Sequence, residues 1–141
     1  MLKYVKSLKT LALTYNQAEN GNLTVIEGEK DIPFQIQRIF IVRAPQGAVR
    51  GGHAHIICNQ FLICTAGKVE VVCRDETDVC KIILDKPNIG ILIPSGIWAE
   101  QRYIDPSSVL TVLCDRNYEE TDYIRNYGEY LKYRTIQSNG K

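Results

Sequence analysis

The two histidines of this chain, His53 and His55, are separated by a single residue. In an extended segment, residues two apart project to the same face, so both imidazoles would converge on one side of a strand. Imidazoles arranged in this way either bind a metal ion or transfer protons. Arg50 precedes them, and Gly51 and Gly52 allow the backbone to bend or to approach a ligand closely. This stretch is the candidate functional site.

The composition narrows the classes of protein that could carry this site. The chain has 141 residues and a formal net charge of +1, which predicts one ordinary domain over residues 1–141 with no basic surface for nucleic acid. Its apolar runs are too short to span a bilayer. The N-terminus spreads lysines among its apolar residues, so we expect no secretory signal and no membrane partner. We therefore expect a cytoplasmic protein.

The five cysteines, at positions 58, 64, 73, 80 and 114, form an odd set without a Cys-x-x-Cys spacing. A disulfide framework or a zinc site needs paired or clustered spacing. We interpret these cysteines as apolar thiols in a reducing compartment.

The sequence predicts that the secondary structure around the histidines consists mainly of strands. Short β-prone or apolar runs recur between turn signals, which is typical of an all-β sandwich or barrel. The runs cover residues 23–27, 36–43, 61–64, 68–74, 79–84, 89–93 and 109–114, and a polar loop with a turn at Asn20-Gly21 is expected over 16–22. Acidic residues at the start and basic residues at the end predict one helix over 119–134. Residues 135–141 are expected to form a flexible tail.

The spacing of Gly47, His53, His55, Gln60 and Gly67 resembles the first signature motif of the cupin superfamily, with glutamine in place of its usual glutamate. A second stretch, Gly90-x-x-x-Pro94-x-Gly96-x-x-Ala99, resembles the second motif with a shortened spacer and with alanine in place of its usual histidine. The resemblance implies a cupin jelly-roll barrel, which the rhythm of strands and turns supports.

Within that superfamily, residues 23–127 resemble the nucleotide-sugar 3,4-ketoisomerases of the WxcM-like family. The shared segments include Arg50 to His55 with Gln60, Trp98-x-Glu100, and residues 120–125. The resemblance implies an enzyme that moves the keto group of dTDP-4-keto-6-deoxyglucose from C4 to C3 in deoxyamino-sugar biosynthesis. It also implies a homodimer with exchanged N-terminal strands, here within residues 1–30.

The same resemblance bears on the choice between a metal and proton transfer. Metal-binding cupins use three histidines and a glutamate, whereas this chain has Gln60 and Ala99 at two of those positions. Glutamine is a poor ligand for a transition metal and alanine is none. We therefore expect no metal and no other cofactor. Proton transfer by imidazole is the favoured chemistry, since its ordinary pKa of about 6.5 suits a base near neutral pH.

The roles implied for individual residues follow from this chemistry. We expect His55 to be the base, and His53 to orient the substrate or stabilise the enediolate, although the two roles could be exchanged. Relatives often carry a tyrosine where Phe40 stands, so the histidines would act alone or with Tyr103.

Four further residues are candidates for binding the substrate. Arg50 suits a bidentate contact to the pyrophosphate. Gln60 could contact a sugar hydroxyl or a histidine, or be a buried amide satisfied by the backbone. Trp98 could stack on the substrate or pack in the core. Glu100 could polarise a histidine, contact substrate or be solvated.

Two alternatives to the isomerase stay open. One is a cupin module that binds the sugar nucleotide without turnover, and the other is a metal-dependent cupin oxygenase.

Overall fold

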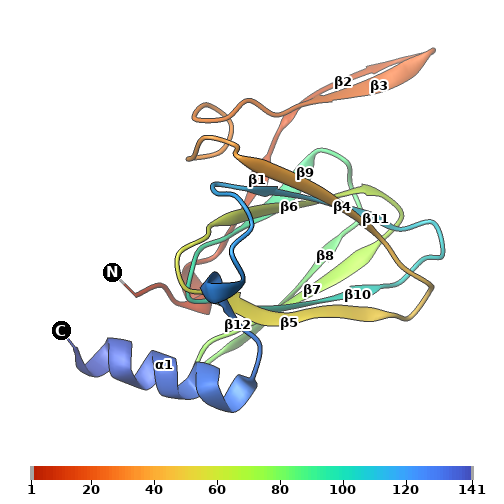
Figure 1. The fold of residues 1–141 in the computed structure, drawn as a ribbon. Helices are drawn as coiled ribbons and strands as arrows, with labels where there is room; N and C mark the ends of the chain where they lie inside the picture. The colour runs from red at the N-terminus through yellow and green to blue at the C-terminus, as the bar shows by residue number, and fades with distance from the viewer. Residues whose placement is uncertain (1, 141) are drawn as a thin grey trace.

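The computed structural model describes residues 2–140 and places most of them in two antiparallel sheets that face each other (Figure 1). In spatial order the strands of the first sheet are β1 (Lys9–Ala12), β9 (Ile89–Ile93), β6 (Gln60–Ala66), β11 (Val109–Cys114) and β4 (Arg38–Arg43). Those of the second are β12 (Tyr123–Ile124), β5 (Val49–His55), β10 (Trp98–Tyr103), β7 (Val69–Arg74) and β8 (Val79–Leu84). The predicted all-β fold with a C-terminal helix is confirmed.

The alternation of side chains along the strands builds the core between the sheets. In β7 the inward residues Val69, Val71 and Cys73 are fully buried, while the residues between them are half-buried. Leu62 and Val112 meet them from the first sheet in the same cluster. Burying this apolar surface is the main driving force for closing the two sheets on each other.

The strand β6 is buried on both faces, because the N-terminal part of the chain covers its outer side. Phe61 and Ile63 point outward and pack with Leu13 and Ile32 in a second cluster. This is why residues 60–64 are continuously apolar or buried instead of alternating.

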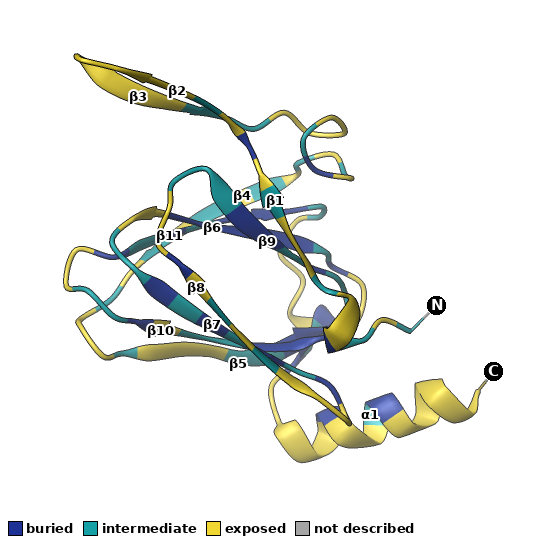
Figure 2. Ribbon diagram, turned by 180° about the vertical axis from the view of Figure 1, so that it is seen from behind, coloured by how far each residue is buried: buried dark blue, intermediate teal, exposed yellow. Residues whose placement is uncertain are grey.

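The strands β2 (Thr14–Ala18) and β3 (Gly21–Val25) form a hairpin that projects away from the barrel and is largely exposed (Figures 1 and 2). The chain turns at Glu19 and Asn20, one residue before the predicted turn at Asn20-Gly21, and Gly21 already belongs to β3. The prediction of a loop over residues 16–22 is wrong, because both strands extend into it.

The C-terminal helix begins later than predicted. α1 covers Tyr127–Asn139, and the Asn126 side chain caps it by accepting a hydrogen bond from the Glu129 amide at 2.9 Å. The residues expected to start the helix instead form a 3-10 turn, η2 (Glu120–Asp122), and β12, because Tyr123 and Ile124 pair with β5. The expected tail is helical up to Asn139, and residue 141 lies outside the described residues.

A second 3-10 turn, η1 (Val5–Ser7), precedes β1. Within residues 2–140, no helix has both the length and the apolar character needed to cross a membrane.

Candidate active site

The two histidines lie at the end of β5, on the face that points between the sheets. Their ring centroids are 5.1 Å apart. His53 is half-buried, whereas His55 is only 5% exposed. Gly51 and Gly52 precede them with φ of +83° and +75°, and these left-handed conformations accommodate a register shift where β5 meets β10. The period-2 argument from the sequence is therefore correct for both imidazoles.

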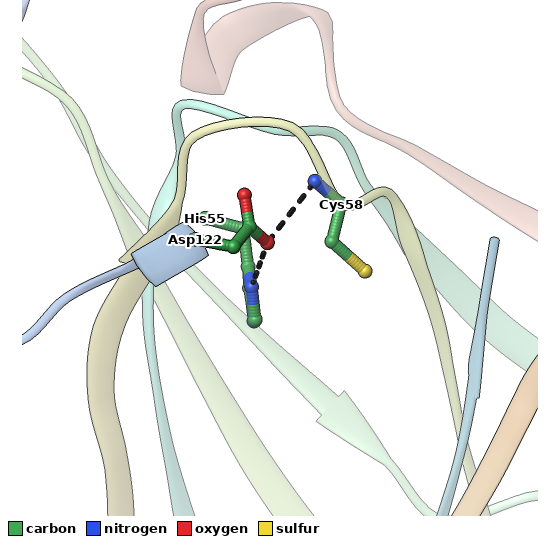
Figure 3. A group of neighbouring side chains, drawn as sticks. All are labelled: His55, Cys58 and Asp122. Carbon is green, nitrogen blue, oxygen red and sulfur yellow. Dashed lines mark hydrogen bonds and ion pairs between the residues drawn. The ribbon is translucent and has the colours of Figure 1, made fainter. Parts of the chain in front are cut away.

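His55 is held by a carboxylate from the C-terminal part of the chain. Its Nδ1 lies 2.9 Å from Oδ2 of Asp122, which is itself buried (Figure 3). Asp122 also accepts hydrogen bonds from the backbone amides of Ile57 at 2.6 Å and Cys58 at 3.3 Å. The carboxylate is thus fixed from three sides and in turn fixes the orientation of the His55 ring.

Tyr123 packs against both imidazoles. Its ring centroid lies 5.0 Å from that of His53 and 4.4 Å from that of His55, and the Arg125 guanidinium lies 4.3 Å from the Tyr123 ring centroid. Its position follows from the pairing of β12 with β5, where Tyr123 is the register partner of His55. The roles of Asp122 and Tyr123 were missed at the sequence level. Both lie in the segment 120–125 that carries the family resemblance, and that was the available signal.

A cavity of about 110 Å³ lies between the sheets next to His53. His53 lines it together with Arg50, Gln60, Gln101 and Tyr103, and its remaining wall is mostly apolar, including Phe40. His55 is not among the lining residues; it lies behind His53 against Asp122. The structure therefore brings four predicted residues, His53, Arg50, Gln60 and Tyr103, to one cavity.

Burial sets the protonation of these groups. Desolvation, reinforced by the neighbouring His55 and Arg125, lowers the pKa of His53 to about 4. The pKa of His55 is also lowered by burial, against the opposing effect of its hydrogen bond to Asp122. Burial raises the pKa of Tyr103 to about 12. At neutral pH both imidazoles are therefore neutral and can accept a proton, while the Tyr103 phenol can donate a hydrogen bond.

Gln60 is buried at the start of β6. Its Nε2 donates to Sγ of Cys114 at 3.5 Å, a distance at which a sulfur acceptor gives only a weak hydrogen bond. The Gln60 amide therefore retains hydrogen-bonding capacity toward the cavity.

Two predicted binding residues lie elsewhere. Trp98 and Glu100 alternate with the inward residues of β10 and so point to the outer face of that sheet. Trp98 is 4% exposed and packs under α1 against Tyr127 and Tyr130, with ring centroids 5.1 and 5.5 Å away. Glu100 accepts a hydrogen bond from Nε1 of Trp98 at 3.2 Å. The core alternative for Trp98 is therefore the correct one, and the carboxylate beside a histidine is that of Asp122 and not that of Glu100.

One group of side chains in the described residues could approach a metal ion. Ligand atoms of His55, Cys58 and Asp122 lie within 4.8 Å of one another, and all three residues are buried (Figure 3). In this arrangement, however, Asp122 is a hydrogen-bond acceptor for the His55 ring and for two backbone amides. This arrangement is better suited to holding the His55 ring in one orientation than to binding a metal ion.

Two facing antiparallel sheets with a histidine lining an interior cavity define a cupin-type jelly roll with a site for acid and base chemistry. The chain belongs to the FdtA family, described as WxcM-like, C-terminal, whose model matches residues 6–135.

Comparison with individual proteins supports this family assignment. The chain is 37% identical over 114 residues to the TDP-4-oxo-6-deoxy-alpha-D-glucose-3,4-oxoisomerase of Aneurinibacillus thermoaerophilus, covering 80% of this chain and 82% of that protein. The crystal structure of the sugar 3,4-ketoisomerase QdtA from Thermoanaerobacterium thermosaccharolyticum in complex with TDP is similar with a TM-score of 0.90 and 32% identity, covering 94% of this chain and 98% of that one. A QdtA variant with a histidine replaced by asparagine, in complex with TDP-4-keto-6-deoxyglucose, also gives a TM-score of 0.90, at 31% identity and with 94% and 97% coverage.

Proposed function

We propose that this chain is a sugar-nucleotide 3,4-ketoisomerase that converts TDP-4-keto-6-deoxyglucose to the 3-keto isomer. The observation that carries the proposal is His53, a neutral imidazole facing an interior cavity, in a chain 37% identical to a TDP-4-oxo-6-deoxyglucose oxoisomerase. The QdtA variant that binds TDP-4-keto-6-deoxyglucose supports both the substrate and the importance of a histidine.

The reaction needs two proton movements. The ketone at C4 acidifies the hydrogen on C3, so a base can remove it and leave an enediolate across C3 and C4. Reprotonation at C4, with transfer of the hydroxyl proton from O3 to O4, leaves a hydroxyl at C4 and a ketone at C3. A single base that keeps the proton can serve both carbons when they present the same face.

His53 is the base that the geometry favours. It lines the cavity, whereas His55 lies behind it and is engaged by Asp122. This exchanges the two roles expected from the sequence. The lowered pKa keeps His53 unprotonated and ready to accept a proton at neutral pH, although it also makes the imidazole a weaker base than a free one. A base in contact with the acidified hydrogen compensates for that weakness through proximity.

His55, Asp122 and Tyr123 act as positioning residues. The Asp122 carboxylate holds the His55 ring, and the rings of His55 and Tyr123 support that of His53 at 5.1 and 5.0 Å. These ring contacts keep the His53 imidazole in one orientation relative to the sugar, which is how a preorganised site lowers the cost of reaching the transition state.

The remaining cavity residues supply contacts to the substrate. The Tyr103 phenol, whose raised pKa keeps it neutral, can donate a hydrogen bond to the developing enediolate oxygen. Gln60 offers an amide to a sugar hydroxyl. Arg50 is exposed at the edge of the cavity, where a guanidinium can bind a pyrophosphate bidentately. No metal or other cofactor is needed for these steps.

We also propose that the protein forms a homodimer through the face that carries β4 and the β2–β3 hairpin. Ile39 and Ile41 on β4, an edge strand of its sheet, are 58% and 64% exposed, and the largely exposed hairpin projects from the barrel (Figure 2). An exposed apolar edge strand is normally covered. Exchange of residues 1–30 between protomers would provide the cover.

The cysteine thiols are all free in residues 2–140, which agrees with a cytoplasmic location.

The test of function is incubation of the purified protein with TDP-4-keto-6-deoxyglucose in heavy water, followed by proton NMR. Formation of the 3-keto isomer, with solvent deuterium entering at C3 or C4, is the expected result. Binding of the sugar nucleotide with neither exchange nor conversion would instead support a binding module. Metal analysis of the purified protein separates the oxygenase alternative.

A further inference from the structure

Gln101 is a polar side chain of the cavity to which the proposed mechanism gives no role. It lies on the inward face of β10 between Ala99 and Tyr103, and it lines the cavity together with His53. In the strand register it is opposite Arg50 on β5 and Val71 on β7. It is therefore held on the central part of a sheet, where its position is fixed by neighbours on both sides.

The Gln101 amide is free to bind a ligand. The side chain is half-buried, and within residues 2–140 its amide forms no hydrogen bond that would engage it. A carboxamide has two N–H donors and an oxygen acceptor. Because the Gln101 side chain lines the cavity, its amide is within reach of a ligand that fills the cavity.

The opposite strand makes room for this side chain. A Cβ atom at Gly51 would lie 2.6 Å from Oε1 of Gln101 and 2.9 Å from the carbonyl oxygen of Ala99. Gly51 also has φ +83°, a conformation that other residues rarely adopt. Glycine at this position therefore leaves the space into which the Gln101 amide projects beside His53.

Resting on the proposed function, we propose that Gln101 binds the keto and hydroxyl oxygens on the two reacting carbons of the sugar. A ketone accepts a hydrogen bond and the adjacent hydroxyl can donate one, so a single carboxamide matches the pair. As O4 gains negative charge in the enediolate, the bond from the Gln101 N–H strengthens. The side chain then stabilises the transition state more than the bound substrate, so its loss lowers kcat more than it raises KM.

The kinetic test compares wild type with Gln101→Leu, a substitution of similar size that removes the amide. We expect kcat to fall by roughly 10- to 100-fold, somewhat less than the loss typical of an oxyanion donor. Gln101→Glu keeps the length and an acceptor but loses the N–H donors and places a carboxylate beside the enediolate, so its kcat should also fall. Gln137→Leu, on the exposed face of α1, is the matched control and should leave kcat unchanged. Wild-type kcat in Gln101→Glu would overturn the proposal.

A binding test works whether or not the protein is an isomerase. His53→Asn prevents turnover, and calorimetry then compares His53→Asn with the double variant His53→Asn/Gln101→Leu. We expect the second substitution to weaken binding of TDP-4-keto-6-deoxyglucose by about 10-fold, the size of one good hydrogen bond, and to leave binding of TDP unchanged. Equal affinities for the sugar nucleotide, or an equal loss for TDP, would contradict the role of Gln101. Failure of wild type to isomerise would contradict the proposed function, and the binding comparison would still test the role of Gln101.

Discussion

Nδ1 of His55 and Oδ2 of Asp122 lie 2.9 Å apart and join two segments that are 67 residues apart in the chain. Because the carboxylate accepts, the proton of a neutral His55 resides on Nδ1 and its Nε2 carries the lone pair. The same carboxylate accepts the amides of Ile57 and Cys58 in the turn that follows β5. One buried residue from η2 thereby fixes both the tautomer of His55 and the end of the strand that carries it.

This relationship predicts the effect of Asp122→Asn. The variant should lose about 10- to 100-fold in kcat, because His55 no longer has a charged acceptor and the support of His53 loosens. It should also lose about 1–3 kcal/mol of unfolding free energy, because an amide group cannot accept all three hydrogen bonds. Kinetics and chemical denaturation measure the two effects. Asp85→Asn, at an exposed position, is the control, and an Asp122→Asn variant as active and stable as this control would refute the assignment.

The pKa of His53 predicts the acid limb of the pH profile. A base with a pKa of about 4 stays unprotonated down to that pH, so kcat/KM should remain high through pH 6 and fall near pH 4. An unperturbed imidazole would lose activity near pH 6.5. Rates measured in short assays from pH 3.5 to 8 distinguish the two, and an acid limb close to 6.5 would contradict the environment described for His53.

The pKa of His53 also predicts how the free energy of unfolding changes with pH. The folded-state pKa of His53 lies below the value near 6.5 of an unfolded chain, so the unfolded state binds more protons between about pH 4 and 6.5. The free energy of unfolding therefore decreases as the pH falls through this window. His53→Asn should show a shallower decrease over this range in urea titrations. Parallel curves for the two proteins would argue against the shift.

Trp98 should behave as a core residue. Its ring is buried between β10 and α1 against Tyr127 and Tyr130. Trp98→Ala should therefore cost about 3–5 kcal/mol of unfolding free energy. The milder variant Trp98→Phe should keep the fold and bind TDP with wild-type affinity. A large loss of TDP affinity in folded Trp98→Phe would restore its predicted role as a stacking platform.

The proposed dimer face can be tested with a matched pair of substitutions. Ile41 on β4 is 64% exposed, and Ile83 on the outer face of the second sheet is 45% exposed. Ile41→Glu places a charge in the proposed interface and should shift the protein to a monomer, whereas Ile83→Glu should leave the dimer intact. Light scattering after gel filtration measures the mass. A wild-type monomer, or the same mass for both variants, would show that this face is not the interface.

Local sequence patterns predicted most of the strands, because the barrel strands alternate or are continuously apolar as their burial demands. The start of the helix was predicted wrongly, because Tyr123 and Ile124 pair with β5, and such a long-range pairing leaves no local signal. Trp98 and Glu100, two candidate binding residues, lie on the outer face of β10. Period-2 alternation separates Trp98 and Glu100 from Gln101 and Tyr103, but the sequence does not state which set faces the histidines.

Asp122 shows the same limit within the site. It reaches His55 only because η2 folds back over the end of β5. From the sequence alone, a carboxylate in an acidic stretch is expected to be exposed to solvent. By contrast, the family resemblance implied the grouping of His53 with Arg50 and Gln60. Period-2 alternation alone would place Arg50 and His53 on opposite faces, and the register shift between β5 and β10 brings them to one cavity.

The most direct measurement is proton NMR of TDP-4-keto-6-deoxyglucose in heavy water with wild type, His53→Asn and His55→Asn. If His53 is the base, wild type converts the substrate to the 3-keto isomer. His53→Asn should then lose conversion and exchange at C3 by at least about 1,000-fold while still binding TDP, and His55→Asn should retain measurable exchange. Wild-type exchange in His53→Asn, together with its loss in His55→Asn, would contradict the account.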